Sequence, residues 1–223
     1  MTDDDAPVLR DVPDTAVGYR LILPPGWLRL DARSDAGRAK LDAELDRVLP
    51  RSYDPTLAPV VAQARSQAHA ALRQARDGGA VDLYLPLGGV RGIPIPASFL
   101  VAVRRFATAP PPNLAAKGSE ALVAALTANL AATMPDAQVK LMPAGPAVRS
   151  ARPATAPESE ANPQLEGVRI DYVWPVPGDA ALWVMVSFTA MRTPELPESI
   201  TDQLAGLFDA IMSTWRWEPG LTL

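Results

Sequence analysis

Apolar residues recur at two different spacings along this chain, and each spacing predicts one kind of element. In four segments they return every three or four positions, as they do on one face of a helix. These predicted helices cover residues 36–49, 57–77, 119–130 and 200–215. Pro50 ends the first helix and Gly78-Gly79 ends the second, whereas Ser119 and Ser199 are suitable N-caps for the other two.

Elsewhere apolar and polar residues alternate, which is the period of a β-strand. The predicted strands are residues 18–23, 27–30, 81–87, 97–106, 137–142, 146–151, 168–174 and 181–191. A short corner rich in Gly and Pro separates 81–87 from 97–106, so these two strands are expected to pair as a hairpin.

The strand at 181–191, ALWVMVSFTAM, is apolar on both faces. Its even positions from Leu182 to Phe188 face one way, and Trp183, Met185 and Met191 face the other. A strand with one wet face would show polar residues at alternate positions. The pattern therefore predicts a central strand that is covered on both sides.

The order of these elements predicts the fold class. Neighbouring strands are joined mostly by short turns, so we expect an α+β fold: a largely antiparallel central sheet of about 6–8 strands with helices packed on both faces, an α/β/α sandwich. We expect a flexible acidic leader at 1–16, a single sandwich domain at 17–217 and a tail at 218–223. The polar stretch near 151–164, ARPATAPESEANPQ, is predicted to be a mobile loop inside that domain.

Composition narrows the chemistry that is available. The 223 residues include no cysteine and one histidine, which excludes thiolate nucleophiles, Cys-ligated zinc and His clusters. We therefore predict no metal, no cofactor and no recognisable catalytic residue. A net charge of −4 gives no general attraction to nucleic acid, and no apolar run is long enough for membrane insertion. The N-terminus lacks the pattern of a secretory signal, so we predict a cytoplasmic protein.

Polar groups that could act as catalysts are few. His69 lies in the middle of a predicted helix without an acidic residue at ligand spacing, and we assign it no role. Asp171 and Arg169 share one face of a strand, and Asp82 lies on another strand. Asp171 and Asp82 form a carboxylate pair only if those strands are neighbours. The favoured interpretation is that these polar side chains lie at a solvated strand edge. An enzyme that uses Asp171, Asp82 or Tyr172 is our least favoured hypothesis.

Tryptophans lie at the boundaries of the predicted elements, where an indole can cap the core and keep its N–H near water. Capping is the expected role of Trp27 and Trp215, and Trp183 is expected in the core. Large aromatics at a rim are also used by protein interfaces. The candidate interaction surface comprises Trp27, Trp174, Trp217 and Arg216.

Two terminal segments carry a family resemblance. LILPPGWLRL at 21–30, and the strand from Val184 followed by the helix that ends FDAIMSTW at 208–215, resemble the opening and closing segments of PsbP/Mog1-like sandwiches, including LpqN-type actinobacterial proteins. This resemblance covers about the outer third of the chain. It implies an antiparallel sheet between helices, used in that group mainly for binding. The chain also looks similar to uncharacterised actinobacterial proteins found in the setting of type VII secretion, which implies an accessory role. The resemblance transfers no catalytic residue.

Two functional hypotheses follow. The first is a non-enzymatic protein-interaction or accessory module, associated with type VII secretion, that binds a protein partner. The alternative is a small-ligand carrier or sensor with a cleft between the sheet and the helix at 57–77, where alanines leave room.

Overall fold

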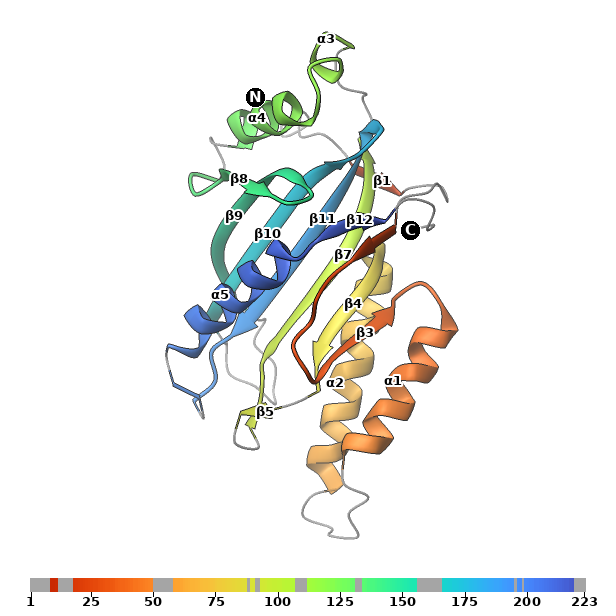
Figure 1. The fold of residues 1–223 in the computed structure, drawn as a ribbon. Coiled ribbons are helices and arrows are strands. Elements are labelled where there is room, and N and C mark those ends of the chain that lie inside the picture. Colours follow the sequence, from red (N-terminus) through yellow and green to blue (C-terminus); the bar gives the residue numbers. More distant parts are fainter. Residues whose placement is uncertain are drawn as a thin grey trace, which may run out of the picture.

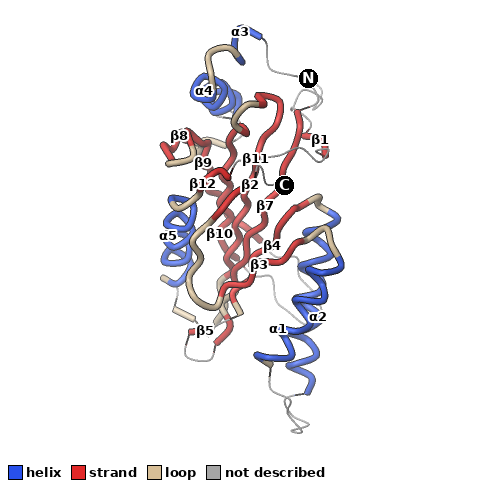
Figure 2. Tube along the Cα trace, turned by 45° about the vertical axis from the view of Figure 1, so that its right-hand side comes forward, coloured by secondary structure: helices blue, strands red, loops and turns tan. Residues whose placement is uncertain are grey.

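The computed structural model describes residues 9–11, 18–49, 58–87, 89–90, 93–106, 112–130, 134–155, 166–194, 196–197 and 199–218. In these segments one large sheet lies between helices on its two faces (Figures 1 and 2). The expectation of an α+β sandwich is therefore confirmed.

The large sheet is antiparallel at every strand pair. Its strands lie in the order β3 (Trp27–Asp31), β4 (Ala80–Pro86), β7 (Ala97–Phe106), β11 (Asp179–Met191), β10 (Glu166–Val176), β9 (Gly145–Thr155) and β8 (Gln138–Met142), and β1 (Leu9–Asp11) also pairs with β7. The predicted pairing of 81–87 with 97–106 is confirmed by β4 and β7. A separate small hairpin joins β5 (Gly89–Val90) to β6 (Ile93–Pro94).

Helix α5 (Ile200–Ser213) covers one face of the sheet, where Leu204, Phe208 and Ile211 pack on the central strands. The opposite face is covered at two ends. Helices α1 (Asp35–Val48) and α2 (Ala58–Asp77) pack on β3 and β4, while α4 (Ser119–Leu130), preceded by the short α3 (Pro112–Ala115), packs near β9 and β10. Figure 2 shows α5 and the α1–α2 pair on different sides of the sheet.

Strand β11 is central, as predicted, because it lies between β7 and β10. Six of its apolar residues are at most 3% exposed: Leu182, Trp183, Val184, Val186, Phe188 and Ala190. The face away from α5 is less uniformly apolar than expected, because Ser187 lies on it directly opposite Asp171 of β10. Both polar residues are buried and bond to each other.

Two strands that are almost 200 residues apart pair in a small sheet that we call the terminal arm, formed by β2 (Gly18–Arg20) and β12 (Arg216–Glu218). The expected strand at 18–23 is thus shorter than predicted. Strand pairing stops after Arg20, and the chain instead contacts the C-terminal end of α5, where the Ile22 N–H donates to the Thr214 hydroxyl at 2.9 Å.

Three predicted irregular segments contain strands. Leu9–Asp11 of the expected leader pairs with β7, and Glu218 of the expected tail belongs to β12; the other residues of 1–16 and 219–223 lie outside the described residues. The expected loop at 151–164 begins later, because β9 runs to Thr155. Among the described residues, β9 pairs there with β10 alone, so Pro153 costs no ladder hydrogen bond on the other side of the strand. Residues 156–165 lie outside the described residues.

Among the described residues, no helix combines the length and the apolar character that crossing a bilayer requires.

Candidate functional site

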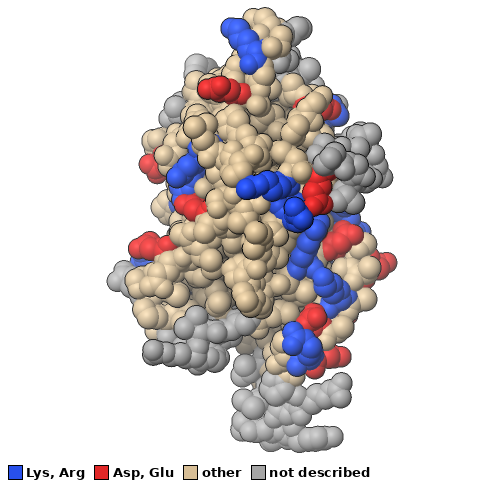
Figure 3. Space-filling model, in the orientation of Figure 1, with Lys and Arg blue, Asp and Glu red and all other residues tan. Residues whose placement is uncertain are grey.

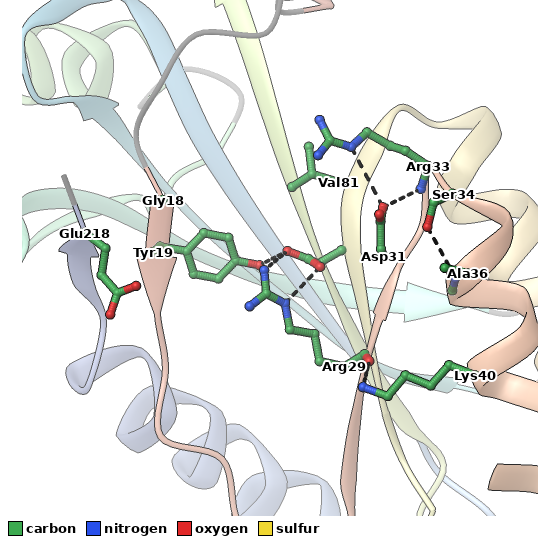
Figure 4. A pocket seen from close by; sticks show the side chains of 12 residues that line it. Gly18, Tyr19, Arg29, Asp31, Arg33, Ser34, Ala36, Lys40, Val81 and Glu218 are labelled. Carbon is green, nitrogen blue, oxygen red and sulfur yellow. Dashed lines mark hydrogen bonds and ion pairs between the residues drawn. The ribbon is translucent and has the colours of Figure 1, made fainter. Parts of the chain in front are cut away.

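A cleft of about 480 Å³ opens between the terminal arm, strands β3 and β4, and the start of α1 (Figure 4). Its polar side chains come from elements that are far apart in sequence: Tyr19, Arg29, Asp31, Arg33, Asp82 and Glu218. Figure 3 shows Lys and Arg side chains in a band over this side of the molecule.

Strand pairing places the polar groups on one face. Leu28 and Leu30 of β3 point into the core beneath α1 and α2, so Arg29 and Asp31 point to the other side. In the β3–β4 register Arg29 lies opposite Tyr84, and Asp31 lies opposite Asp82. The alternation of β3 and β4 therefore builds one wall of the cleft.

The second wall is the start of α1, which lies very close to β3. The Ser34 side chain caps this helix by accepting from the Gly37 N–H at 3.3 Å. A Cβ at Gly37 would lie 1.9 Å from the Asp31 carbonyl oxygen. Glycine is therefore what allows α1 to approach the strand so closely.

Asp82 is the acceptor that connects the polar side chains in the buried part of the cleft. It is 5% exposed and accepts from Arg29 through Nε at 2.9 Å and Nη2 at 2.8 Å. It also accepts from the Tyr19 hydroxyl. The Tyr84 hydroxyl lies 2.8 Å from that of Tyr19, and because the Tyr19 proton is used on Asp82, Tyr84 donates to Tyr19.

These contacts keep the two phenols protonated and Arg29 charged. Burial, and then the negative charge of Asp82, raise the pKa of Tyr19 and of Tyr84 well above the ordinary value. Burial on its own lowers the pKa of Arg29, but its hydrogen bonds to Asp82 and the nearby negative charges outweigh burial and raise that pKa above its ordinary value. At neutral pH both tyrosines are therefore hydrogen-bond donors rather than bases.

The outer wall of the cleft carries weaker contacts. Asp31 accepts from the Arg33 backbone N–H at 2.9 Å. Burial on its own raises the pKa of Asp31, but hydrogen bonds from Arg33 and Ser34 outweigh it and lower that pKa. The Arg33 Nε lies 3.9 Å from Asp31, and Glu218 pairs with Arg20 of β2 at 3.3 Å.

A second, partly buried network connects α5 to the sheet. Asp209 of α5 accepts from Arg149 of β9 through two N–H groups, each at 3.0 Å, and from the Tyr172 hydroxyl of β10 at 2.9 Å. Burial, and then the bond to Asp209, raise the pKa of Tyr172. This arrangement holds a helix in place, because every polar group in it is engaged within the protein.

The residues of the enzyme hypothesis are not brought together. Asp82 lies on β4, whereas Asp171 and Tyr172 lie on β10, with β7 and β11 between them. Asp171 also faces the side opposite to Tyr172. The expected solvated strand edge is wrong for Asp171 and for Asp82, because β10 and β4 each have neighbours on both sides and the two residues are only 6% and 5% exposed.

His69 joins two helices. Its Nε2 lies 3.0 Å from Asp42 of α1, and its side chain is 22% exposed. The acidic neighbour comes from another helix, so the spacing within α2 gave no sign of it. Within the described ranges, no three His, Asp or Glu side chains are grouped as a metal site requires.

The candidate interaction surface is only partly at the surface. Trp174 is 2% exposed, so its assignment to that surface is wrong: β10 continues past Pro175 to Val176, and Trp174 stays inside the sheet against Trp215. Trp183 is buried as expected. The expected capping role of Trp215, with its N–H near water, is wrong: Trp215 is fully buried, and its Nε1 has no hydrogen-bond partner among the described residues.

The other members of that surface have separate contacts. Trp217 is half-buried and donates to the Ala144 carbonyl at 2.9 Å, whereas Trp27 packs against Phe99 at 5.4 Å between ring centroids. Arg216 is exposed and donates to the Trp215 and Ser213 carbonyls at the end of α5.

The cleft found here differs in place from the one expected beside the helix at 57–77. That helix, α2, contributes no residue to it. Leu72 and Ala75 of α2 are buried against the sheet with Leu83, so side chains fill the expected space. The sequence signal for the actual cleft was the alternation of Arg29 and Asp31 on β3 and of Asp82 and Tyr84 on β4.

Comparisons with known proteins identify no relative: no family model and no curated protein matches the chain.

Proposed function

We propose that the protein is a non-enzymatic binding protein that holds a small polar ligand in the cleft between the terminal arm, β3, β4 and α1. The observation that carries this proposal is the cleft itself, with polar groups from five elements facing one space. Concave sites with a few well-placed polar groups are where proteins bind small molecules.

The state of the polar groups supports binding rather than catalysis. Asp82 already accepts three hydrogen bonds, and the two tyrosines keep their protons because their pKa values are raised. A general base needs an uncommitted acceptor with a pKa near the working pH. The arrangement instead resembles a rigid scaffold that positions donors.

A thermal-shift screen of small metabolites tests this proposal. A ligand that binds only the folded state at 100 times its Kd adds about 2.7 kcal/mol of stability. We expect a hit whose shift disappears in Ala36→Trp, because Ala36 is an exposed residue that lines the cleft. Ala39→Trp is the matched control, since Ala39 is exposed on the same helix and does not line it. Hits that survive in Ala36→Trp, or no hits at all, contradict the proposal.

A second candidate function is the binding of a protein partner, as an accessory module. The observation that favours it is the edge strand β8, where Leu141 is 82% exposed and Val139 is 44% exposed. Exposed edge strands are sites of pairing with other chains. Trp27, Trp217 and Arg216 remain a proposed part of such an interaction surface.

Leu141→Glu tests the second candidate. We expect it to remove a partner that co-purifies with the wild-type protein from the native host. Ile22→Glu is the control, because Ile22 is 70% exposed and belongs to the connection between β2 and β3 rather than to β8. Equal loss in both variants, or no loss in either, argues against β8 as the binding edge.

The resemblance to PsbP/Mog1-like and LpqN-type proteins is also a proposal, and with it the actinobacterial setting, the association with type VII secretion and a cytoplasmic location. Its support is positional. The segment 21–30 runs from the end of β2 into β3, and Phe208 of α5 and Trp215 just after it both lie in the core. Gene neighbourhood in the source genome tests it.

A further inference from the structure

The three carboxylates that line the cleft are already used by the protein. Asp82 accepts from Tyr19 and twice from Arg29. Asp31 accepts from the Arg33 backbone and from Ser34. Glu218 lies at the far side of the cleft in Figure 4, and Arg20 matches its charge. The acceptors on this side of the cleft therefore have little remaining capacity.

The donors, by contrast, have remaining capacity. The Arg33 side chain is 48% exposed, and its nearest carboxylate oxygen, on Asp31, is 3.9 Å away, which is beyond hydrogen-bond length. Arg29 uses Nε and Nη2 on Asp82, and its Nη1 makes no hydrogen bond to any described residue. Figure 4 shows both side chains reaching from the β3–α1 side of the cleft, with the Arg33 guanidinium above that of Arg29.

The charged groups of the cleft and its rim are almost balanced. Arg29 is matched by Asp82, Arg33 by Asp31 and Glu218 by Arg20. Lys40 donates only to the Arg29 carbonyl at 3.0 Å, and no carboxylate among the described residues pairs with it. The charged residues that line the cleft therefore sum to zero, with Arg29, Arg33 and Lys40 against Asp31, Asp82 and Glu218, and one excess positive charge remains when Arg20, the partner of Glu218, is counted with them.

We propose that the ligand of this cleft carries a carboxylate or phosphate group, which is bound between Arg33 and the Nη1 of Arg29. This inference rests on the proposed function and names the chemical class of its ligand. A planar guanidinium fork donates two parallel, charge-assisted hydrogen bonds to either group, whereas a neutral acceptor forms weaker hydrogen bonds and a cation is repelled. Arg33 supplies most of the recognition, because Arg29 is held on Asp82.

Titration of the full-length, ¹⁵N-labelled chain by NMR tests the inference, with inorganic phosphate and succinate as separate probes at constant ionic strength. We expect saturable shifts of the Ser34 and Gly37 amides with at least one probe, since both residues line the cleft. The probe that binds more tightly assigns the group as phosphate or carboxylate.

Arg33→Gln is expected to weaken that binding by about tenfold or more, because hydrogen bonds to a charged group are lost. Arg38→Gln is the matched control: Arg38 is exposed on α1 and does not line the cleft. Arg33→Lys keeps the charge without the fork, and we expect it to bind with intermediate affinity. Urea midpoints of all three variants establish that they fold.

Two outcomes overturn the inference. One is the absence of saturable shifts with both probes. The other is equal loss in Arg33→Gln and Arg38→Gln, which indicates attraction by general surface charge. An uncharged ligand that binds wild type and Arg33→Gln equally, but not Ala36→Trp, leaves the proposed function standing and removes only the anionic class. A cleft that binds neither the anions nor any screened metabolite removes both.

Discussion

Tyr19→Phe is expected to destabilise the protein more than Tyr84→Phe, although each variant removes one hydroxyl from the same buried series of hydrogen bonds, which runs from Tyr84 through Tyr19 to Asp82. Tyr19 donates to the charged Asp82 and receives from Tyr84, so it is in the middle of the chain. Its ring stays stacked on Trp215, with 4.2 Å between centroids, in the Phe variant. The effect therefore reports hydrogen bonding rather than packing.

The magnitudes follow from what each variant leaves behind. Tyr19→Phe removes a hydrogen bond to a charged acceptor, worth about 2 kcal/mol, and leaves the Tyr84 hydroxyl buried without a partner, which adds about 1 kcal/mol. Tyr84→Phe removes one neutral hydrogen bond at the end of the chain, worth about 1 kcal/mol. The double variant removes the orphaned hydroxyl, so its cost is about 1 kcal/mol below the sum of the two.

Urea unfolding followed by far-UV circular dichroism measures these differences in the free energy of unfolding. For a chain of this size, 3 kcal/mol corresponds to a fall in Tm of about 6–12 °C. Equal losses in the two single variants, or strictly additive losses in the double variant, refute the proposed order of donors in the chain.

Three further predictions concern stability. Gly37→Ala is expected to destabilise by several kcal/mol, because its Cβ would meet the Asp31 carbonyl at 1.9 Å, whereas Gly206→Ala on α5 meets nothing within 4 Å and is expected to stabilise by about 0.5–1 kcal/mol; urea midpoints compare them. Asp209→Asn is expected to cost about 2 kcal/mol, since it weakens the charged bonds from Arg149 that hold α5, and near-neutral stability contradicts that role. Raised tyrosine pKa values mean that stability is fully present below the unfolded-state pKa of about 10 and falls as pH rises beyond it, by up to about 1.4 kcal/mol per pH unit for each group. The groups are Tyr19, Tyr84 and Tyr172. Alkaline unfolding curves should therefore be shallower in Tyr19→Phe than in wild type.

The layered fold could be predicted because its signals are local. The double apolar pattern at 181–191 identified the central strand, and the helical spacings found α1, α2, α4 and α5 within two residues at each end. Short connections then made antiparallel pairing the natural choice. The predicted end of β9 was wrong because tertiary contacts, not local sequence, determine where this strand ends. At Pro153 the strand pairs only with β10 among the described residues, so the missing N–H of proline is tolerated.

The cleft could not be predicted because it depends on pairings between distant segments. Tyr19 meets Asp82 across 63 positions, and β3 meets β4 only after two helices have intervened. The sequence shows that Arg29 and Asp31 share a face, but not what lies opposite them. Trp174 was misplaced for the related reason that a following proline does not end a strand whose continuation is held by its neighbour.

Native mass spectrometry of the protein purified from its own host tests the claim of ligand binding most directly. The account predicts a bound small molecule on wild type and on Ala39→Trp, and none on Ala36→Trp. Wild-type protein that carries no ligand, or a ligand retained equally by Ala36→Trp, would contradict it.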